Sequence, residues 1–255
     1  MAGILKVKNL TVRFGESVIV DNLSFDVQKG ESLAVIGPNG SGKTVLLRAL
    51  VGFLPYEGAV EWSSAARIGY VPQKVDLDRK IPMNVSNLLH AKAALLKIKK
   101  SEVNSIVKTV NLAPRILTEP IGHLSSGQLQ KALVAFALLG HPNVILFDEP
   151  TASMDQPGEE QTYELIHRLQ DDFDVTPIVV SHDLSFVYKY ATQVLCLNKQ
   201  GLCFGEPRAV LTPSVLEKLY GAPGGFYHHL HEESHEKTHH HHLEEKEATQ
   251  KHHHG

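Results

Sequence analysis

Three short runs of continuous apolar residues are the clearest feature of the hydrophobic pattern. They lie at Leu33–Ile36, Val144–Phe147 and Ile178–Val180, and none of them alternates with polar residues. Strands that are apolar on both faces are typical of the buried interior of a parallel sheet. Residues 143–205 also alternate between strand-like and helical stretches, so the pattern predicts an α/β fold.

The remaining stretches follow other periods. Residues 4–30 and 58–71 alternate and turn like antiparallel strands. Residues 84–138 are rich in helical patterns, and one helix is expected from about Gln128 to Leu139, with Gly140 at its end. The sequence therefore predicts a parallel core sheet, an N-terminal antiparallel β subdomain and an inserted α-helical subdomain over about 84–138.

Glycines crowd the segment after the first apolar run. Residues 37–44 read GPNGSGKT, the pattern of a phosphate-binding loop between a buried strand and a helix. Glycines allow backbone N–H groups to surround a phosphate, and the helix that follows points its positive end at it. Lys43 is expected to reach the β and γ phosphates, and the Thr44 hydroxyl to ligate Mg²⁺. The predicted ATP-binding residues of this loop are Gly37, Asn39, Gly40, Ser41, Gly42, Lys43 and Thr44.

Two acidic residues follow the second apolar run. Because ligands bind at the carboxyl ends of parallel strands, Asp148 and Glu149 are expected to emerge beside the phosphate loop. Asp148 is suited to hold Mg²⁺ through water, and Glu149 is suited to polarise an attacking water as general base. With the phosphate loop, they form the core of a phosphate-loop NTPase.

A third motif, LSSGQ at 124–128, precedes the second apolar strand by about twenty residues. With these three motifs in this order, the chain resembles the nucleotide-binding subunits of ATP-binding-cassette transporters over residues 4–221. The resemblance implies that Ser125, Ser126, Gly127 and Gln128 contact the ATP held by a second copy of the chain, at a helix N-terminus. The sequence departs from the family pattern at Ser126, Lys131 and Phe136, where glycine, arginine and arginine are usual.

The same resemblance implies further site residues. Phe14 matches an aromatic residue that stacks on adenine, and Gln73 matches a glutamine that reaches both Mg²⁺ and the attacking water. Residues 152–155 match a loop that crosses the dimer interface, and His182 matches a histidine that contacts the γ phosphate. Within the family, residues 66–89 and 219–221 most resemble the zinc and manganese uptake branch.

Composition and charge narrow the class of protein. The chain has 255 residues, of which 42% are hydrophobic, enough for one cassette at residues 1–225 and a tail at 226–255. No apolar stretch approaches the ~20 residues that span a bilayer, and the N-terminus does not resemble a signal peptide. Residues 1–225 carry 22 acidic and 22 basic residues, which argues against a nucleic-acid groove. Cys196 and Cys203 are too few and too far apart to suggest a disulfide framework or a zinc site, and both are expected to be core or ordinary thiols.

The tail has a different composition. It contains eleven of the sixteen histidines, mixed with six glutamates and few apolar residues, so we expect it to be disordered. Neutral imidazole binds Zn²⁺, and carboxylates can supply further ligands. An engineered tag and an inert polar tail are the alternatives. The histidines expected to bind Zn²⁺ are His228, His229, His231, His235, His239, His240, His241 and His242.

The function expected from these features is the ATP-hydrolysing subunit of a metal-ion importer, with zinc as the favoured ion. It would bind ATP and Mg²⁺, form a homodimer, and work with an integral membrane permease and an extracytoplasmic metal-binding protein. Its place would be the cytoplasmic side of the cell membrane. The alternatives are a soluble cassette ATPase without a pore, of the iron–sulfur assembly type, and a slow, metal-sensing regulatory ATPase.

Overall fold

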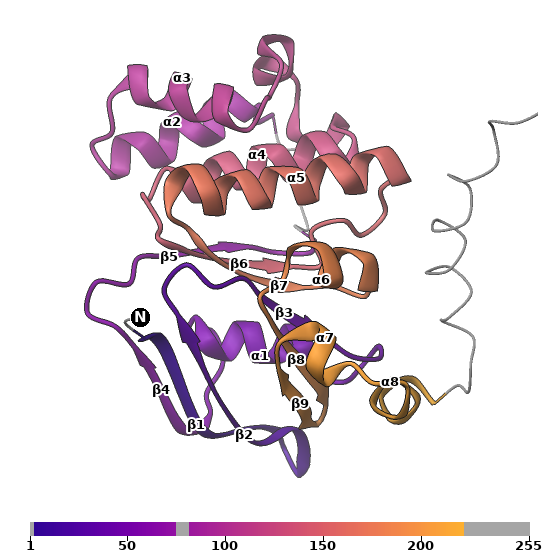
Figure 1. Ribbon diagram of the computed structural model, residues 1–255. Helices are drawn as coiled ribbons and strands as arrows, with labels where there is room; N and C mark the ends of the chain where they lie inside the picture. Colours follow the sequence, from indigo (N-terminus) through magenta and orange to yellow (C-terminus); the bar gives the residue numbers. More distant parts are fainter. Residues whose placement is uncertain (1–2, 75–81, 222–255) are drawn as a thin grey trace, which may run out of the picture.

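The computed structural model describes residues 3–74 and 82–221. The strands are β1 Gly3–Phe14, β2 Ser17–Gln28, β3 Leu33–Ile36, β4 Glu57–Trp62, β5 Ile68–Val71, β6 Val144–Asp148, β7 Thr176–Val180, β8 Gln193–Asn198 and β9 Gln200–Gly205. The helices are α1 Lys43–Leu50, α2 Val85–Leu95, α3 Lys100–Thr109, α4 Ser126–Leu138, α5 Gln156–Phe173, α6 Leu184–Tyr190, α7 Pro207–Val210 and α8 Pro213–Tyr220, with 3₁₀ turns at Pro114–Thr118 and Ile121–His123. Figure 1 shows two β-sheets with helix α1 between them, a layer of helices that includes α2 to α5 over the central sheet, and the short helices α7 and α8 beside β8 and β9.

A six-stranded sheet forms the centre of the molecule, in the order β5-β6-β7-β3-β8-β9. Its first five strands pair in parallel, and β9 returns antiparallel to β8. All three apolar runs recognised in the sequence lie inside this sheet. Every residue of β3, β6 and β7 is buried, which confirms the predicted parallel core of an α/β fold.

The second sheet is antiparallel, in the order β2-β1-β4, and it confirms the predicted N-terminal β subdomain. The expectation that residues 58–71 are antiparallel throughout is wrong for β5, which pairs in parallel with β6. Exposed and buried residues alternate along β5 because it is an edge strand with a neighbour on one side only. That alternation resembles the pattern of an antiparallel strand.

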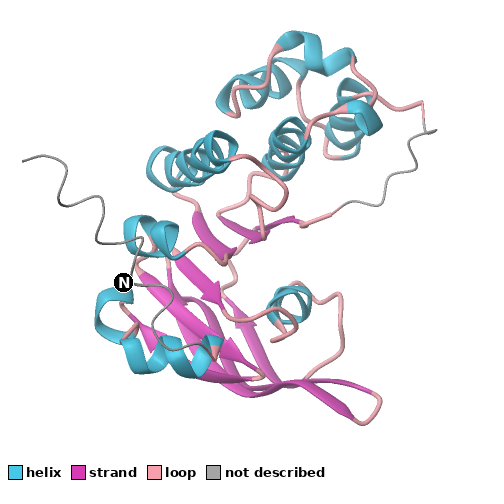
Figure 2. Ribbon diagram, turned by 90° about the vertical axis from the view of Figure 1, so that its right-hand side faces the viewer, coloured by secondary structure: helices cyan, strands magenta, loops and turns pink. Residues whose placement is uncertain are grey.

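Helices α2, α3 and α4 form the helical subdomain, which lies on the opposite side of the six-stranded sheet from the antiparallel sheet (Figures 1 and 2). The predicted helix at Gln128–Leu139 runs from Ser126 to Leu138, so it begins earlier than expected. In residues 3–74 and 82–221 no helix is long and apolar enough to cross a membrane.

Two hydrophobic cores share the central sheet. Along β3, Ala34 and Ile36 point into the core beneath the helical subdomain, whereas Leu33 and Val35 point into the core against the antiparallel sheet and α1. Because both faces of this strand are covered, the phosphate loop that follows it starts from a rigid base.

The cysteines differ from the prediction. Cys196 on β8 and Cys203 on β9 are directly opposite in the strand register, with Cα atoms 4.9 Å apart, and their sulfurs form a disulfide. The expectation of two ordinary thiols is therefore wrong. A separation of seven residues gave no signal of pairing, because only the register of the β8–β9 hairpin brings the two side chains together.

Candidate nucleotide-binding site

The phosphate loop lies between β3 and α1, in the strand–loop–helix setting that its motif requires. Gly37, Gly40 and Gly42 all have positive φ. A side chain at Gly37 would overlap the carbonyl oxygen of Leu197, and one at Gly42 would lie 3.0 Å from that of Ile19. Glycine is therefore required at both positions by backbone that passes close to the loop.

Lys43 closes the loop from inside. Its side chain is 5% exposed, and its Nζ donates to the carbonyl oxygens of Gly37 at 2.9 Å and Pro38 at 3.0 Å. Burial lowers the pKa of Lys43, against the opposing effect of the Glu149 carboxylate 4.0 Å away. Burial removes water from the ammonium group, so an anionic phosphate is a suitable additional partner for it.

Ser41 adds a second polar group to the loop. Its side chain is 3% exposed, and within the described residues its Oγ has no hydrogen-bond partner. A buried hydroxyl without a partner is costly, and a phosphate oxygen would satisfy it.

Asp148 ends β6 beside the first turn of α1. Its carboxylate is 1% exposed and accepts from Thr44 Oγ1 at 2.8 Å and from the Tyr70 hydroxyl at 3.2 Å. Burial raises the pKa of Asp148, and the two hydroxyl donors partly offset this. Oxygen ligands on a buried acid are what Mg²⁺ prefers, so Asp148 and Thr44 fit the ion. Tyr70 was missed from the sequence because only its neighbour Gln73 matches a motif.

Glu149 follows directly and stands in an unusual backbone conformation, with φ of 48°. Its Oε2 accepts from Gln73 Nε2 at 2.5 Å, which joins the loop after β5 to the loop after β6. Both side chains line a pocket of about 380 Å³ together with the phosphate loop. The other residues lining this phosphate pocket are Ile19, Asn39, Gly40, Gly42, Lys43, Thr44 and Val45.

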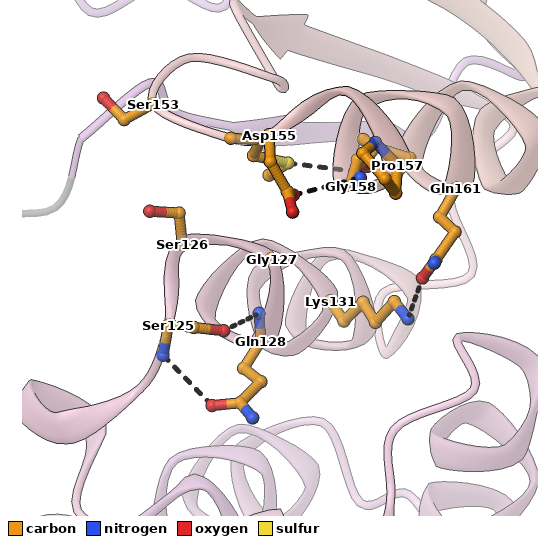
Figure 3. Close-up of a pocket in the computed structure, with 12 residues that line it drawn as sticks. Ser125, Ser126, Gly127, Gln128, Lys131, Ser153, Asp155, Pro157, Gly158 and Gln161 are labelled. Atoms are coloured by element: carbon orange, nitrogen blue, oxygen red, sulfur yellow. Dashed lines mark hydrogen bonds between the residues drawn. The ribbon is translucent and has the colours of Figure 1, made fainter.

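The LSSGQ motif is built differently. Ser125 is the N-cap of α4: its Oγ accepts from the amide of Gln128 at 3.3 Å, and the Gln128 side chain accepts from the Ser125 amide at 3.0 Å. The amides of Ser126 and Gly127 lie in the first turn and have no acceptor within the helix. A pocket of about 450 Å³ lies between this helix start and the first turn of α5, as Figure 3 shows. It is called the signature pocket below, and it shares no lining residue with the phosphate pocket.

Comparisons with known proteins show the family of the chain that carries these two pockets. Residues 20–152 match the family model of the ABC transporter. The chain belongs to the ABC transporter family. It is 35% identical over 237 residues to the zinc import ATP-binding protein ZnuC of Photorhabdus laumondii, covering 91% of each chain. It is 38% identical over 220 residues to a protein of Thermotoga maritima described as the ATP-binding protein of a metal transport system, covering 85% of this chain and 90% of that one.

A solved structure agrees with the sequence relatives. It is described as an ABC transporter of the metal-chelate type in an inward-facing conformation, with a TM-score of 0.78 and 28% identity. The match covers 87% of this chain and 90% of that one. The chain is accordingly the ATP-binding, ATP-hydrolysing subunit of an ABC system, as its motifs predicted.

Not every predicted site residue lies in these two pockets. Phe14 is 51% exposed at the end of β1, and His182 is exposed between β7 and α6. Neither is among the residues that line the phosphate pocket or the signature pocket. Burial and the nearby Asp183 carboxylate raise the pKa of Glu159, and His182 opposes that rise. The histidines of the tail lie outside the described residues.

Proposed function

We propose that this ABC ATPase drives import of a divalent metal ion, zinc, across the cell membrane. The observation that carries the proposal is the alignment over 91% of the chain with a protein named for zinc import. The second relative, named for metal transport, supports the metal class independently of the choice of ion.

Within one subunit, the phosphate pocket supplies the chemistry. Lys43 and Ser41 would bind phosphate oxygens, and Phe14 would stack on adenine. Thr44, Asp148 and Gln73 would hold Mg²⁺. Bound Mg²⁺ would neutralise charge on the phosphates as the bond to the γ phosphate breaks. Glu149 polarises the attacking water, and Gln73, which donates to its carboxylate, orients that group. His182 contacts the γ phosphate.

The working unit is a homodimer. The signature pocket and the phosphate pocket share no lining residue, and the amides of Ser126 and Gly127 lie free at a helix start. In a head-to-tail dimer the Ser125 hydroxyl and these amides would complete the γ-phosphate site of the other subunit, with Gln128 holding the cap.

The subunit acts on the cytoplasmic side of the membrane, bound to an integral permease that receives its ion from an extracytoplasmic metal-binding protein. A pocket of about 220 Å³ beside Gln73 and Glu149 extends to Leu129 and Leu133 of α4. It therefore lies between the loop that carries Glu149 and helix α4 of the helical subdomain. In this proposal, closure of the dimer is passed to the permease through the Gln73 region.

Uptake in a deletion strain tests the ion and the permease together. Cells lacking the gene are supplied with wild type or with Glu149→Gln, and uptake of labelled zinc, manganese and iron is measured. Only wild type should restore zinc uptake, and it should do so above manganese and iron. Restored uptake of manganese or iron instead of zinc would show that the transported ion is not zinc. Protein that stays out of the membrane fraction in permease-containing cells would favour the soluble ATPase.

We propose that the histidine-rich tail binds Zn²⁺ on the cytoplasmic side. Its support is compositional: eleven histidines lie between residues 226 and 255. A chain ending at Gly225 should keep its ATPase activity and lose most of its Zn²⁺ capacity in calorimetry. Affinity of the full chain should weaken from about pH 7.5 to 5.5, because protons compete for imidazole nitrogens. Equal zinc stoichiometry in the two chains would rule the tail out as the metal site.

A further inference from the structure

Three hydroxyl side chains form a buried chain behind the proposed catalytic residues. Tyr163 of α5 is at its centre, with its hydroxyl 3.1 Å from Thr151 Oγ1 and 3.1 Å from Ser181 Oγ. None of the three residues is more than 4% exposed. The tyrosine ring stacks on Phe186 of α6, with centroids 4.2 Å apart and an angle of 20° between the rings. Packing against Phe186 therefore fixes the orientation of the tyrosine ring, and with it the position of the Tyr163 hydroxyl.

One end of this chain supports the turn that carries Glu149. Thr151 lies two residues after Glu149, and successive backbone hydrogen bonds define the turn. The amide of Ala152 donates to the Glu149 carbonyl, and the amide of Met154 donates to the Thr151 carbonyl, both at 3.1 Å. Glu149 has positive φ, a conformation that a residue with a side chain keeps only when its surroundings enforce it. The Thr151 side chain anchors this turn to α5.

The other end supports the segment that carries His182. Ser181 precedes it directly, and its amide donates to the Val35 carbonyl of β3 at 3.2 Å. The Ser181 Oγ also accepts from the amide of Asp183 at 3.0 Å, and Asp183 in turn caps α6. Both neighbours of His182 are thus held in place, although its own side chain is exposed.

We propose that Tyr163 is a positioning residue for ATP hydrolysis: through Thr151 and Ser181 its hydroxyl holds Glu149 and His182 in fixed relative positions. This proposal rests on the roles proposed for those two residues. A phenylalanine would fill the same space and stack on Phe186 equally well. The hydroxyl is distinctive because it can donate to one neighbour and accept from the other. A shift of about 1 Å in a reacting group can cost about 10²-fold in rate, so a buried link between two such groups bears directly on turnover.

A pair of matched tyrosine variants in the full chain tests the proposal. Tyr163→Phe should lower kcat for ATP hydrolysis by about 10-fold and leave the KM for ATP within about 2-fold, because only the arrangement of reacting groups changes. The control is Tyr188→Phe on α6, whose hydroxyl donates to the carbonyl of Leu211, a residue that belongs to neither turn, at 3.4 Å. It should keep kcat within about 2-fold of wild type. Equal kcat in the two variants, or a change in KM alone, would overturn the proposal.

Two further comparisons separate positioning from simple stabilisation. Thr151→Val removes the partner hydroxyl and should lower kcat about as much as Tyr163→Phe, whereas Thr151→Ser retains it and should recover most of the activity. In a His182→Ala background, Tyr163→Phe should cost less than it does in wild type, because part of its effect passes through His182. Fully additive losses in the double variant would contradict the link. Equal kcat in Thr151→Val and Thr151→Ser would also contradict it, and this second comparison remains possible if Tyr163→Phe fails to fold.

The single variants Glu149→Gln and His182→Ala are measured beside these. Loss of activity in both, together with unchanged activity in Tyr163→Phe, would reject Tyr163 and keep the proposed catalytic roles. Full activity in His182→Ala would reject the role of that histidine, and the Thr151 pair would then judge the link to Glu149 alone.

Discussion

In the proposed function, the phosphate pocket and the signature pocket bind the same ligand by opposite means. In the first, charged groups are buried and already paired: Lys43 is 5% exposed and Asp148 is 1% exposed, and each has hydrogen-bond partners within its own subunit. In the second, Ser125 and Ser126 are exposed, and the motif carries no charge of its own. Its attraction for an anion comes from the start of α4 and its free amides, together with Lys131, which lines the same pocket beside Asp155.

This difference has a consequence for assembly. Lys43, Thr44 and Glu149 line the phosphate pocket, and Asp148 is hydrogen-bonded to Thr44 behind it. With the roles proposed for them, these residues would bind Mg²⁺ and ATP within a single subunit. A helix start in water attracts an anion only weakly, because solvent screens its dipole. The signature pocket should therefore contribute only after the dimer closes and excludes water around the γ phosphate. One subunit would then suffice to bind ATP, whereas hydrolysis would require both subunits of the closed dimer.

The largest effect is expected at Glu149. Glu149→Gln removes the proposed general base but leaves Lys43, Thr44 and Asp148 in place, so hydrolysis should fall by about 10²-fold or more while ATP binding persists. Phosphate release and calorimetric nucleotide binding measure the two quantities separately. Glu160→Gln, at an exposed position on α5, is the matched control and should behave as wild type. Near-normal turnover in Glu149→Gln would show that another group positions the water.

Mixed dimers test the division between the two pockets. Lys43→Ala damages the phosphate pocket, and Ser125→Ala damages the signature pocket. If each site combines both chains, an equal mixture should recover about a quarter of wild-type turnover, because half of the dimers are mixed and half of their sites are intact. Neither variant alone should do so. Recovery no greater than the average of the two separate variants would place the whole site in one subunit.

The two regions also differed in what their sequences could predict. Strands β3 and β6 were predicted because continuous apolar runs have few alternatives, and the motifs after them fixed Lys43 and Asp148. The edge strand β5 alternates and was misassigned. Tyr70 and Tyr163 were not found, because a single aromatic residue in an apolar pattern looks like core, and only folding brings Thr151 and Ser181 to Tyr163. The division of the ATP site between two chains came from the family resemblance, since α4 alone gives no sign of a partner.

A smaller effect is expected from the Cys196–Cys203 disulfide, which joins strands β8 and β9 beside the phosphate loop. The turn between β8 and β9 contacts the phosphate loop, where the amide of Lys199 donates to the Ser41 carbonyl at 3.2 Å. For a closed loop this short, reduction should lower the free energy of unfolding by about 2–3 kcal/mol. Calorimetric melting of wild type with and without reductant measures this.

The matched control for the disulfide is Cys203→Ser, whose melting temperature should not respond to reductant. The KM for ATP should rise in the reduced wild type, because the phosphate loop loses support. Reduction should also raise the KM for ATP in the Ser125→Ala variant, because that substitution lies in the signature pocket and leaves the phosphate loop unchanged. Melting temperatures of wild type that do not differ between the two conditions would show that the bridge adds nothing to stability.

The smallest effect concerns the cost of keeping a buried acid ready for Mg²⁺. Because burial raises the pKa of Asp148, its ionised form destabilises the nucleotide-free protein. Asp148→Asn should therefore raise the melting temperature of the nucleotide-free protein at pH 7. The unfolded carboxyl has an ordinary pKa of about 3.9, so the penalty appears as pH rises above that value and is complete above the higher folded pKa. The gain in melting temperature should thus shrink toward pH 4.

With ATP and Mg²⁺ present, wild type should melt at a higher temperature than Asp148→Asn, because only wild type gains stability from the bound ion. A variant that melts no higher than wild type at pH 7 would mean that Thr44 and Tyr70 already compensate the buried charge.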